Sequence, residues 1–263
     1  MTPVLTNLSA LILSAILILS TVATITTAAV VEGQLLQQED TATTTIFQSV
    51  AGGFRVEVPN GWVVQDLSNT QPVLSSERGI GYHIIAALCM TEDSLPGIGG
   101  TYQCQYAKSG VRVGIIRFSD LDSIPEIEVL ERQNKTITPL DVVALQIGVL
   151  SEPLETSGIE NLRMRTTNDT TVNVIDSETN QTTGTVPAKS VVLTFTYERE
   201  EPTPNIFGGI DNTVNGKLFS LSVLDNNTNT GYSLFTYGLD DADIFKAPPP
   251  PIAQIFDSFE LLE

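Results

Sequence analysis

FQSVAGGFRVEVPNGW, residues 47–62, joins a short apolar start, a Gly-Gly turn, an alternating segment and a Pro-Asn-Gly-Trp turn without a break. Phe54, Val56 and Val58 alternate with polar side chains, which is typical of a strand that buries one face. The stretch therefore predicts the opening hairpin of a single globular domain.

Glycine and proline mark where this hairpin turns. The pair Gly52 and Gly53 can supply the backbone angles of a tight turn, and Pro59-Asn60-Gly61 ends the strand. Trp62, the only tryptophan, follows directly and has a large apolar surface to bury.

The first 31 residues contain no charged side chain and predict an export segment. Their apolar run over residues 8–18 has about the length of a secretory h-region, and a signal peptide could be cleaved after Ala29. Because no Lys or Arg precedes that run, an uncleaved membrane anchor over residues 8–31 is the alternative. Either outcome predicts an extracellular or cell-surface protein.

Residues 32–46 are polar without a sustained period and predict a flexible spacer, and residues 47–263 form the expected domain. The net charge is -18, which disfavours binding to nucleic acid or to an anionic membrane surface because both would repel the chain. An acidic surface keeps a protein soluble, and it also suits cations or a basic partner.

Cys89 and Cys104, the only cysteines, flank a loop-like segment with a proline and three glycines. In an oxidising compartment they are expected to form a disulfide that stabilises the fold by about 3 kcal/mol. A metal site is the alternative, but His83 is the sole histidine and further soft ligands are lacking.

Four Asn-x-Thr triplets make this a candidate glycoprotein, and three of them fall in predicted loops or turns. The candidate asparagines are Asn134, Asn168, Asn180 and Asn226.

The clearest helix is predicted over residues 139–150, where Thr138 can cap the first turn and Asp141 occupies the acidic position of a capping box. A shorter helix is plausible from Pro125. The apolar stripe expected to face the core consists of Leu140, Val143, Ala144, Ile147 and Leu150.

Alternating or apolar runs predict most of the remaining elements as strands. A long Pro-, Gly- and Asn-rich loop is expected over residues 198–216, and a short helix after the prolines at 248–251. The predicted strands are residues 72–75, 82–90, 111–118, 161–167, 172–176, 190–197, 217–224 and 232–239.

Four motifs in this order resemble the PsbP family, the extrinsic subunits of photosystem II and their relatives outside photosynthesis. They are GFRVEVPNGW at residues 53–62, Val-Pro-Ala at 186–188 before a strand ending at Tyr197, GKLFSLS at 216–222 and IFDSF at 255–259. Together they span nearly all of residues 47–263.

The resemblance implies an α/β (α+β) fold, an α/β/α sandwich with a central antiparallel sheet flanked by helices. It also implies a protein that binds others, often as an extrinsic component of a membrane complex, and in plant members an association with calcium and manganese. The sequence lacks a long basic N-terminal arm and is far more acidic, which disfavours a photosystem role. No family site residue maps onto a position here.

A catalytic function is not expected, because no motif for nucleotide binding, serine hydrolysis or zinc hydrolysis occurs. His83 lies inside an apolar strand and is expected to be a buried histidine bonded to a backbone carbonyl. A secreted hydrolase using paired carboxylates remains the enzymatic alternative.

Calcium is the one candidate cofactor, in a calcium-dependent cell-surface protein. Asp240, Asp241 and Asp243 follow Gly238 at the end of a predicted strand and could supply hard oxygen ligands, although they form no EF-hand. Asp120 and Asp122 are a weaker candidate. The favoured function is an exported, non-catalytic binding protein whose partner is a protein of a membrane-associated complex.

Overall fold

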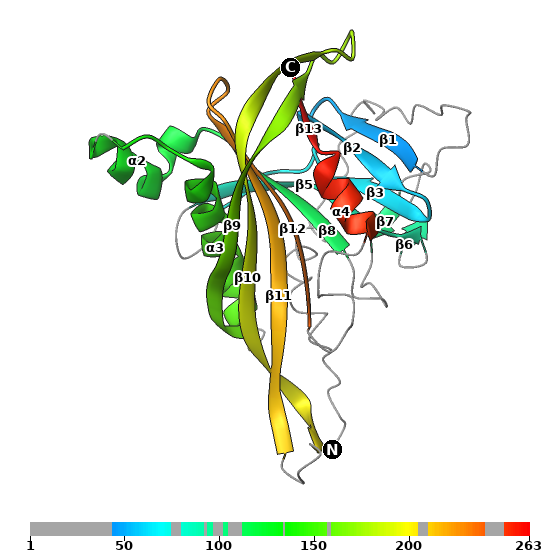
Figure 1. Ribbon diagram of the computed structural model, residues 1–263, viewed down its shortest axis with the longest axis vertical. Coiled ribbons are helices and arrows are strands. Elements are labelled where there is room, and N and C mark those ends of the chain that lie inside the picture. The colour runs from blue at the N-terminus through cyan, green and yellow to red at the C-terminus, as the bar shows by residue number, and fades with distance from the viewer. Residues whose placement is uncertain are drawn as a thin grey trace.

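The computed structural model describes residues 44–74, 80–91, 94–96, 102–104, 112–133, 135–156, 159–204, 210–239 and 250–263. An eleven-stranded sheet dominates these residues, in the order β1-β2-β13-β9-β10-β11-β12-β8-β5-β3, with β4 paired to β5. Figure 1 shows the three longest strands at its centre, helices α2 and α3 on one side, and the opening strands with α4 on the other.

The opening hairpin is confirmed. Strands β1 (Thr44–Ser49) and β2 (Phe54–Pro59) pair antiparallel, so the first described strand starts three residues before the predicted boundary at Phe47. Gly53 adopts a φ of 74°. Gly52 is required for a different reason, because a Cβ there would lie 2.7 Å from the Phe54 ring.

A strand that the sequence did not predict closes the sheet beside this hairpin. Helix α4 (Pro250–Asp257) confirms the predicted helix, and β13 (Glu260–Leu262) follows it. This short strand pairs antiparallel with β2 and parallel with β9 (Ile159–Ile175). Two segments far apart in the sequence are thereby joined into one sheet.

Two predicted boundaries in the second half are wrong. The strands expected at 161–167 and 172–176 are one strand, β9, and the loop expected at 198–216 is largely strand. There β10 (Thr182–Pro204) and β11 (Ile210–Asp225) continue their pairing, with Tyr197 opposite Val214. Cross-strand pairing outweighs the local turn propensity of these residues.

Four of the remaining strands follow the predictions closely: β4 (Val73–Leu74), β5 (Gly81–Met90), β8 (Arg112–Phe118) and β12 (Thr230–Leu239). Strand β3 (Trp62–Asp66), which pairs with β5, was not predicted. A separate two-stranded sheet of β6 (Ser94–Pro96) and β7 (Tyr102–Cys104) lies beside β3.

The helices that cover one face begin with a one-turn 3-10 helix, η4 (Leu121–Ser123), and α2 (Pro125–Arg132). Helix α3 (Pro139–Thr156) runs past the predicted end at Leu150. The acidic half of its capping box is confirmed, since the backbone N–H and the hydroxyl of Thr138 donate to Asp141 Oδ2 at 2.8 and 2.7 Å.

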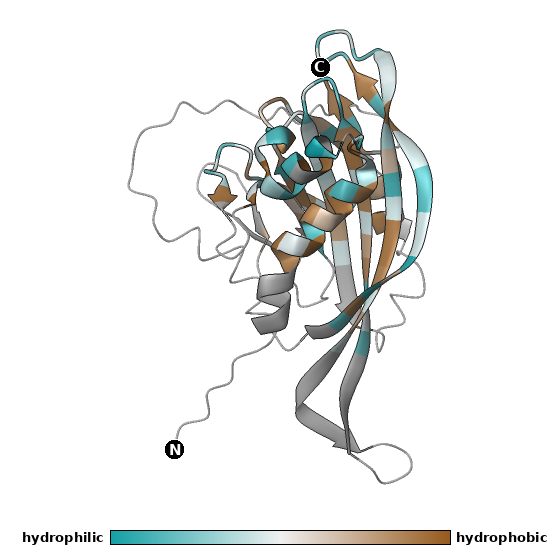
Figure 2. Cartoon of the chain, turned by 90° about the vertical axis from the view of Figure 1, so that its left-hand side faces the viewer, coloured by the Kyte–Doolittle hydropathy of each residue, from teal (hydrophilic) through white to brown (hydrophobic). Residues whose placement is uncertain are grey.

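The predicted core stripe of α3 is only partly correct. Val143 is buried, and Ile147 and Leu150 pack against the same cluster. Leu140 and Ala144 are exposed instead, and the helix also buries Val142, Leu145 and Val149. The helix is apolar around most of its circumference, so its sequence does not fix which side faces the sheet. Figure 2 looks onto α2 and α3 in front of the strands.

Two hydrophobic clusters lie on the two faces of the sheet. One joins the opening hairpin, α4 and the inner strands around Phe54, Trp62 and Phe259. The other packs η4, α2 and α3 against Phe195 and Phe235. The fold is thus mainly β, with few helices. Of the predicted α/β/α sandwich, the structure supports the central, largely antiparallel sheet and the presence of helices packed against it. More than half of the described residues lie in strands.

Candidate interaction site

Strand β9 has an open edge along most of its length. Its inner edge pairs with β10 from Ile159 to Ile175, whereas β13 pairs only with Val174 and Ile175 on the outer edge. Within the described ranges, no strand pairs with the outer edge of residues 159–173. An unpaired edge presents backbone N–H and C=O groups that can accept another strand.

The side chains of this edge are unburied, since every residue from 163 to 171 is exposed. The pairing with β10 skips Arg165, and Asn161 adopts a φ of 56°, so the N-terminal part of β9 is irregular. Residues 166–173 then pair without interruption. This regular part contains four threonines, which favour an extended strand. Its eight residues could therefore pair with a strand of a partner.

Two arginines lie in the irregular part of β9. Arg163 lies opposite Thr194 of β10, and Arg165 Nε donates to the Thr194 hydroxyl at 3.1 Å. Farther along the strand, Asp169 forms an ion pair with Lys189 at 2.8 Å. Because Glu160 and Asp169 belong to the same strand as the two arginines, the four charged residues of β9 balance.

His83 is buried and its Nε2 lies 3.1 Å from the Leu67 carbonyl oxygen, which confirms the predicted role. The Thr70 hydroxyl is 3.0 Å from the same nitrogen and donates to the same carbonyl. Burial lowers the pKa of His83, and the nearby Arg117 guanidinium adds to this shift. The neutral ring thus anchors the loop after β3 to the sheet.

Arg117 and Tyr232 stand in register with His83 across β5, β8 and β12. Arg117 donates to the Ala51 carbonyl at 2.9 Å, which ties the opening turn to the sheet. Burial raises the pKa of the Tyr232 phenol, so the ring stays neutral near pH 7. Gly53 lets the opening turn lie close to the Tyr232 ring, because a Cβ at position 53 would lie 2.7 Å from the Tyr232 hydroxyl. These ionisable groups serve the packing of the hairpin.

A buried polar cluster connects α3 to the sheet. The Ser220 hydroxyl donates to Gln146 Oε1 at 2.7 Å and lies 3.2 Å from the Ser233 hydroxyl, which is 3.2 Å from that of Ser222. All four side chains are almost fully buried. Such a network fixes the position of the helix on the sheet, and no local sequence pattern indicates it.

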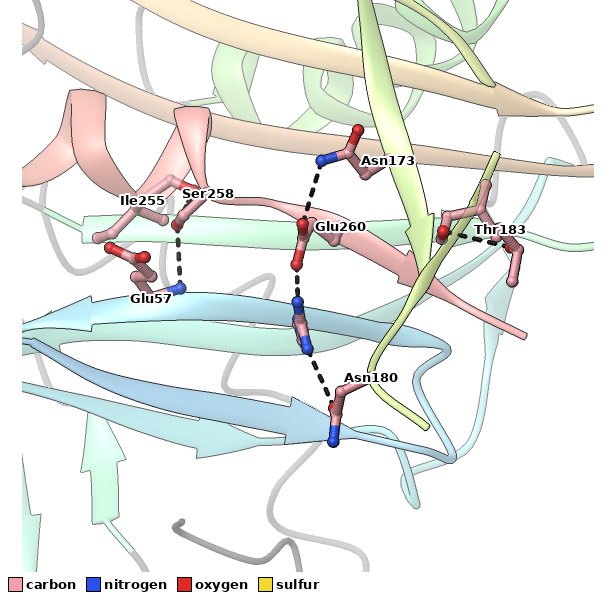
Figure 3. Close-up of polar contacts among 9 residues, drawn as sticks. Glu57, Asn173, Asn180, Thr183, Ile255, Ser258 and Glu260 are labelled. Carbon is pink, nitrogen blue, oxygen red and sulfur yellow. Dashed lines mark hydrogen bonds and ion pairs between the residues drawn. The ribbon is translucent and has the colours of Figure 1, made fainter. Parts of the chain in front are cut away.

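Figure 3 shows the contacts that hold the C-terminal segment. Glu260 accepts from Arg55 Nε and, at 3.2 Å, from Asn173 Nδ2, while Arg55 also donates to Asn180 Oδ1 at 3.1 Å. The Ser258 hydroxyl accepts from the backbone N–H of Glu57 at 2.9 Å. This network joins β2, β9 and β13 and has a structural role.

The predicted calcium ligands Asp240, Asp241 and Asp243 lie outside the described residues, so that prediction stays open. Asp120 and Asp122 are exposed on either side of the start of η4, and the Asp120 carbonyl caps that turn by accepting from Ser123. Where the structure is described, no group of three or more His, Cys, Asp or Glu side chains is arranged to hold a metal.

The disulfide is confirmed between Cys89 and Cys104, whose Cα atoms are 5.8 Å apart. It ties β7 to the sheet next to β3, where the Cys104 N–H donates to Gln65 Oε1 at 3.1 Å. Among the described residues no strand pairs with the outer edge of β3 either, and β7 contacts β3 through side chains.

Three of the four predicted glycosylation sites can be located. Asn180 and Asn226 are exposed next to or within turns, as expected, whereas Asn168 lies within β9 and not in a loop. Asn134 lies outside the described residues. Glycosylation itself stays a prediction.

No described helix is both long and apolar enough to cross a bilayer. The export segment predicted at residues 1–31 falls outside the part of the chain on which this finding rests.

No protein-family model and no curated protein matches this sequence. Among solved structures, the chain is similar to the cyanobacterial PsbP (CyanoP) of Synechocystis sp. PCC 6803, with 9% identity and a TM-score of 0.45 over 86% of this chain and 96% of that one. It is also similar to the Ran-binding protein Mog1p of Saccharomyces cerevisiae, with 8% identity and a TM-score of 0.32 over 83% and 95% of the two chains. Neither similarity assigns the chain to a family.

Proposed function

We propose that this chain is an exported, non-catalytic binding protein that serves as an accessory subunit of a membrane-associated complex. Its partner, a protein, docks on the open edge of β9. The observation that carries this proposal is the outer edge of residues 159–173, with which no strand of the described residues pairs and whose side chains are exposed from 163 to 171. Strand addition to such an edge supplies main-chain hydrogen bonds and places alternate side chains for recognition.

The ionisable groups elsewhere in the described chain support a binding role. The two buried groups with shifted pKa values, His83 and Tyr232, hold the opening turn and its neighbouring loop in place. Asp176 also has a lowered pKa, because its carboxylate accepts from the N–H and hydroxyl of Thr179 in an exposed turn. Each of these shifts has a structural cause.

Site-specific photocross-linking in the producing cells tests the proposal. A benzoylphenylalanine at Thr166 lies on the regular part of the β9 edge, and one at Asn60 lies on an exposed turn at the start of β3 as a matched control. We expect one recurrent, near-stoichiometric membrane-associated partner to be cross-linked from position 166 and not from position 60. Absence of a partner at both positions, or equal labelling from both, would overturn the proposal.

A further inference from the structure

We propose that Asp169 keeps a second copy of this chain from pairing with β9, so that the edge stays free for the partner. This inference rests on the proposed function and concerns which strand the same edge excludes.

The part of the edge that a second copy could use is bounded at both ends. Regular pairing with β10 begins at Thr166. At the other end β13 pairs with Val174, and the Asn173 side chain bonds to the same strand. The regular and accessible window is therefore residues 166–172, and its middle residue is Asp169.

The backbone groups of this window alternate between the two edges of β9. The Ile175 carbonyl accepts from the N–H of Glu263, so residue 175 presents its backbone groups to the outer edge. Because the direction alternates along a strand, Thr167, Asp169 and Thr171 present theirs to the outer edge as well. A strand that pairs with the window must bond to these three residues.

The window nearly matches itself when it is read in the opposite direction. Two copies related by a two-fold axis would pair their windows antiparallel. The register that uses all of residues 166–172 places Thr167 opposite Thr171 of the second copy and Asp169 opposite its own counterpart. Threonine pairs stabilise a sheet, whereas like charges directly opposite each other destabilise it. Asp169 is the only charged residue of the window, so the opposition to self-pairing comes from this residue.

Other registers offer less to a second copy. A shift by two residues separates the two carboxylates, but it shortens the ladder to about five residues and removes one of the three outward-facing residues from it. Fewer main-chain hydrogen bonds then hold the two copies together.

The ion pair with Lys189 does not cancel the repulsion. Lys189 Nζ lies 2.8 Å from Asp169 Oδ1, and Lys189 belongs to β10. A second copy would lie on the other side of β9, two strand spacings or about 10 Å from β10. At physiological salt, charges more than about 8 Å apart are largely screened, whereas two Asp169 carboxylates on adjacent strands would be closer than that. The Asp169 side chain is 88% exposed and would meet its counterpart at this short range.

Sedimentation equilibrium at physiological salt tests the inference on protein produced without glycans, because Asn168 lies in the window. Asp169→Thr removes the charge and adds a strand-forming side chain, and Asp169→Asn removes the charge alone. The matched control is Glu178→Gln, which removes one negative charge from an exposed turn. Adding Thr171→Pro to Asp169→Thr removes an outward N–H and leaves the pairing of β9 with β10 intact.

We expect Asp169→Thr to lower the dissociation constant of the dimer at least about tenfold relative to the unmodified protein, since a like-charge pair becomes a threonine pair. Asp169→Asn should shift it in the same direction, and Glu178→Gln should change it at most about twofold. The added Thr171→Pro should abolish the gain. No gain in either Asp169 variant, an equal gain in the control, or a gain that survives Thr171→Pro would overturn the inference.

The two proposals can fail separately. If Asp169→Thr associates with itself but no partner is cross-linked from position 166, the inference stands and the accessory-subunit function falls. If a partner is cross-linked and both Asp169 variants remain monomeric, the function stands and the inference falls.

Discussion

Phe259 connects the C-terminal segment to the opening hairpin, and replacing it with alanine is the most informative test of the fold. Its ring is 2% exposed and stacks on Phe54 with centroids 5.9 Å apart, while Tyr232 lies at 6.2 Å. Removing a buried phenylalanine costs about 3–5 kcal/mol through lost burial and the cavity left behind. Because two aromatic partners lose their contact, we expect about 4 kcal/mol for Phe259→Ala.

Urea unfolding followed by the fluorescence of Trp62, the only tryptophan, measures this loss directly. Trp62 belongs to the same hydrophobic cluster as Phe259, so its emission reports on that core. Val50→Ala is the control, since this side chain is 67% exposed and should change stability by at most about 0.5 kcal/mol. A loss below about 1 kcal/mol for Phe259→Ala would refute the packing of this segment against the hairpin.

Four further outcomes are expected. Asp141→Ala removes the capping box of α3 and should lower the free energy of unfolding by about 1 kcal/mol in urea titrations. Reduction of the Cys89–Cys104 disulfide should cost about 3 kcal/mol for its 15-residue separation, seen as a lower melting temperature that Cys→Ala variants no longer show. Burial depresses the pKa of His83 below 6.5, so its contribution to stability is present above that pH and is lost as the pH falls toward the folded-state pKa. In the unmodified protein, the urea concentration at the unfolding midpoint should therefore fall between about pH 7 and 5, and this fall should be smaller in His83→Gln. If the predicted calcium site exists, calcium should raise the melting temperature of the unmodified protein and not of Asp241→Asn; an equal rise in both would exclude this aspartate as a ligand.

Sequence patterns predicted the fold where the physical cause is local. The alternation of Phe54, Val56 and Val58 reports directly on a buried strand face, and all three are buried. The Thr138 and Asp141 pair encodes its own cap within one helical turn. In both cases the residues that determine the structure are neighbours in the chain.

Sequence patterns failed to predict the structure where it depends on contacts between residues far apart in the chain. Gln146 is a polar residue in a helix, and its burial depends on Ser220, 74 positions away. Asn168 and Asp169 have turn propensity, yet long pairing with β10 keeps them in a strand. The open edge of β9 exists because β13 pairs with only Val174 and Ile175, which no local pattern reveals.

The position of β13 between β2 and β9 has a consequence for the order in which the chain folds. Arg55 and Glu260, which pair across this junction, are 205 positions apart. During synthesis the β1–β2 hairpin has no neighbouring strand until that late segment arrives, and an isolated hairpin is marginal in water. Closing contacts of such sequence separation is slow. The apolar side of β2 is therefore the surface that a chaperone would need to shield in the growing chain.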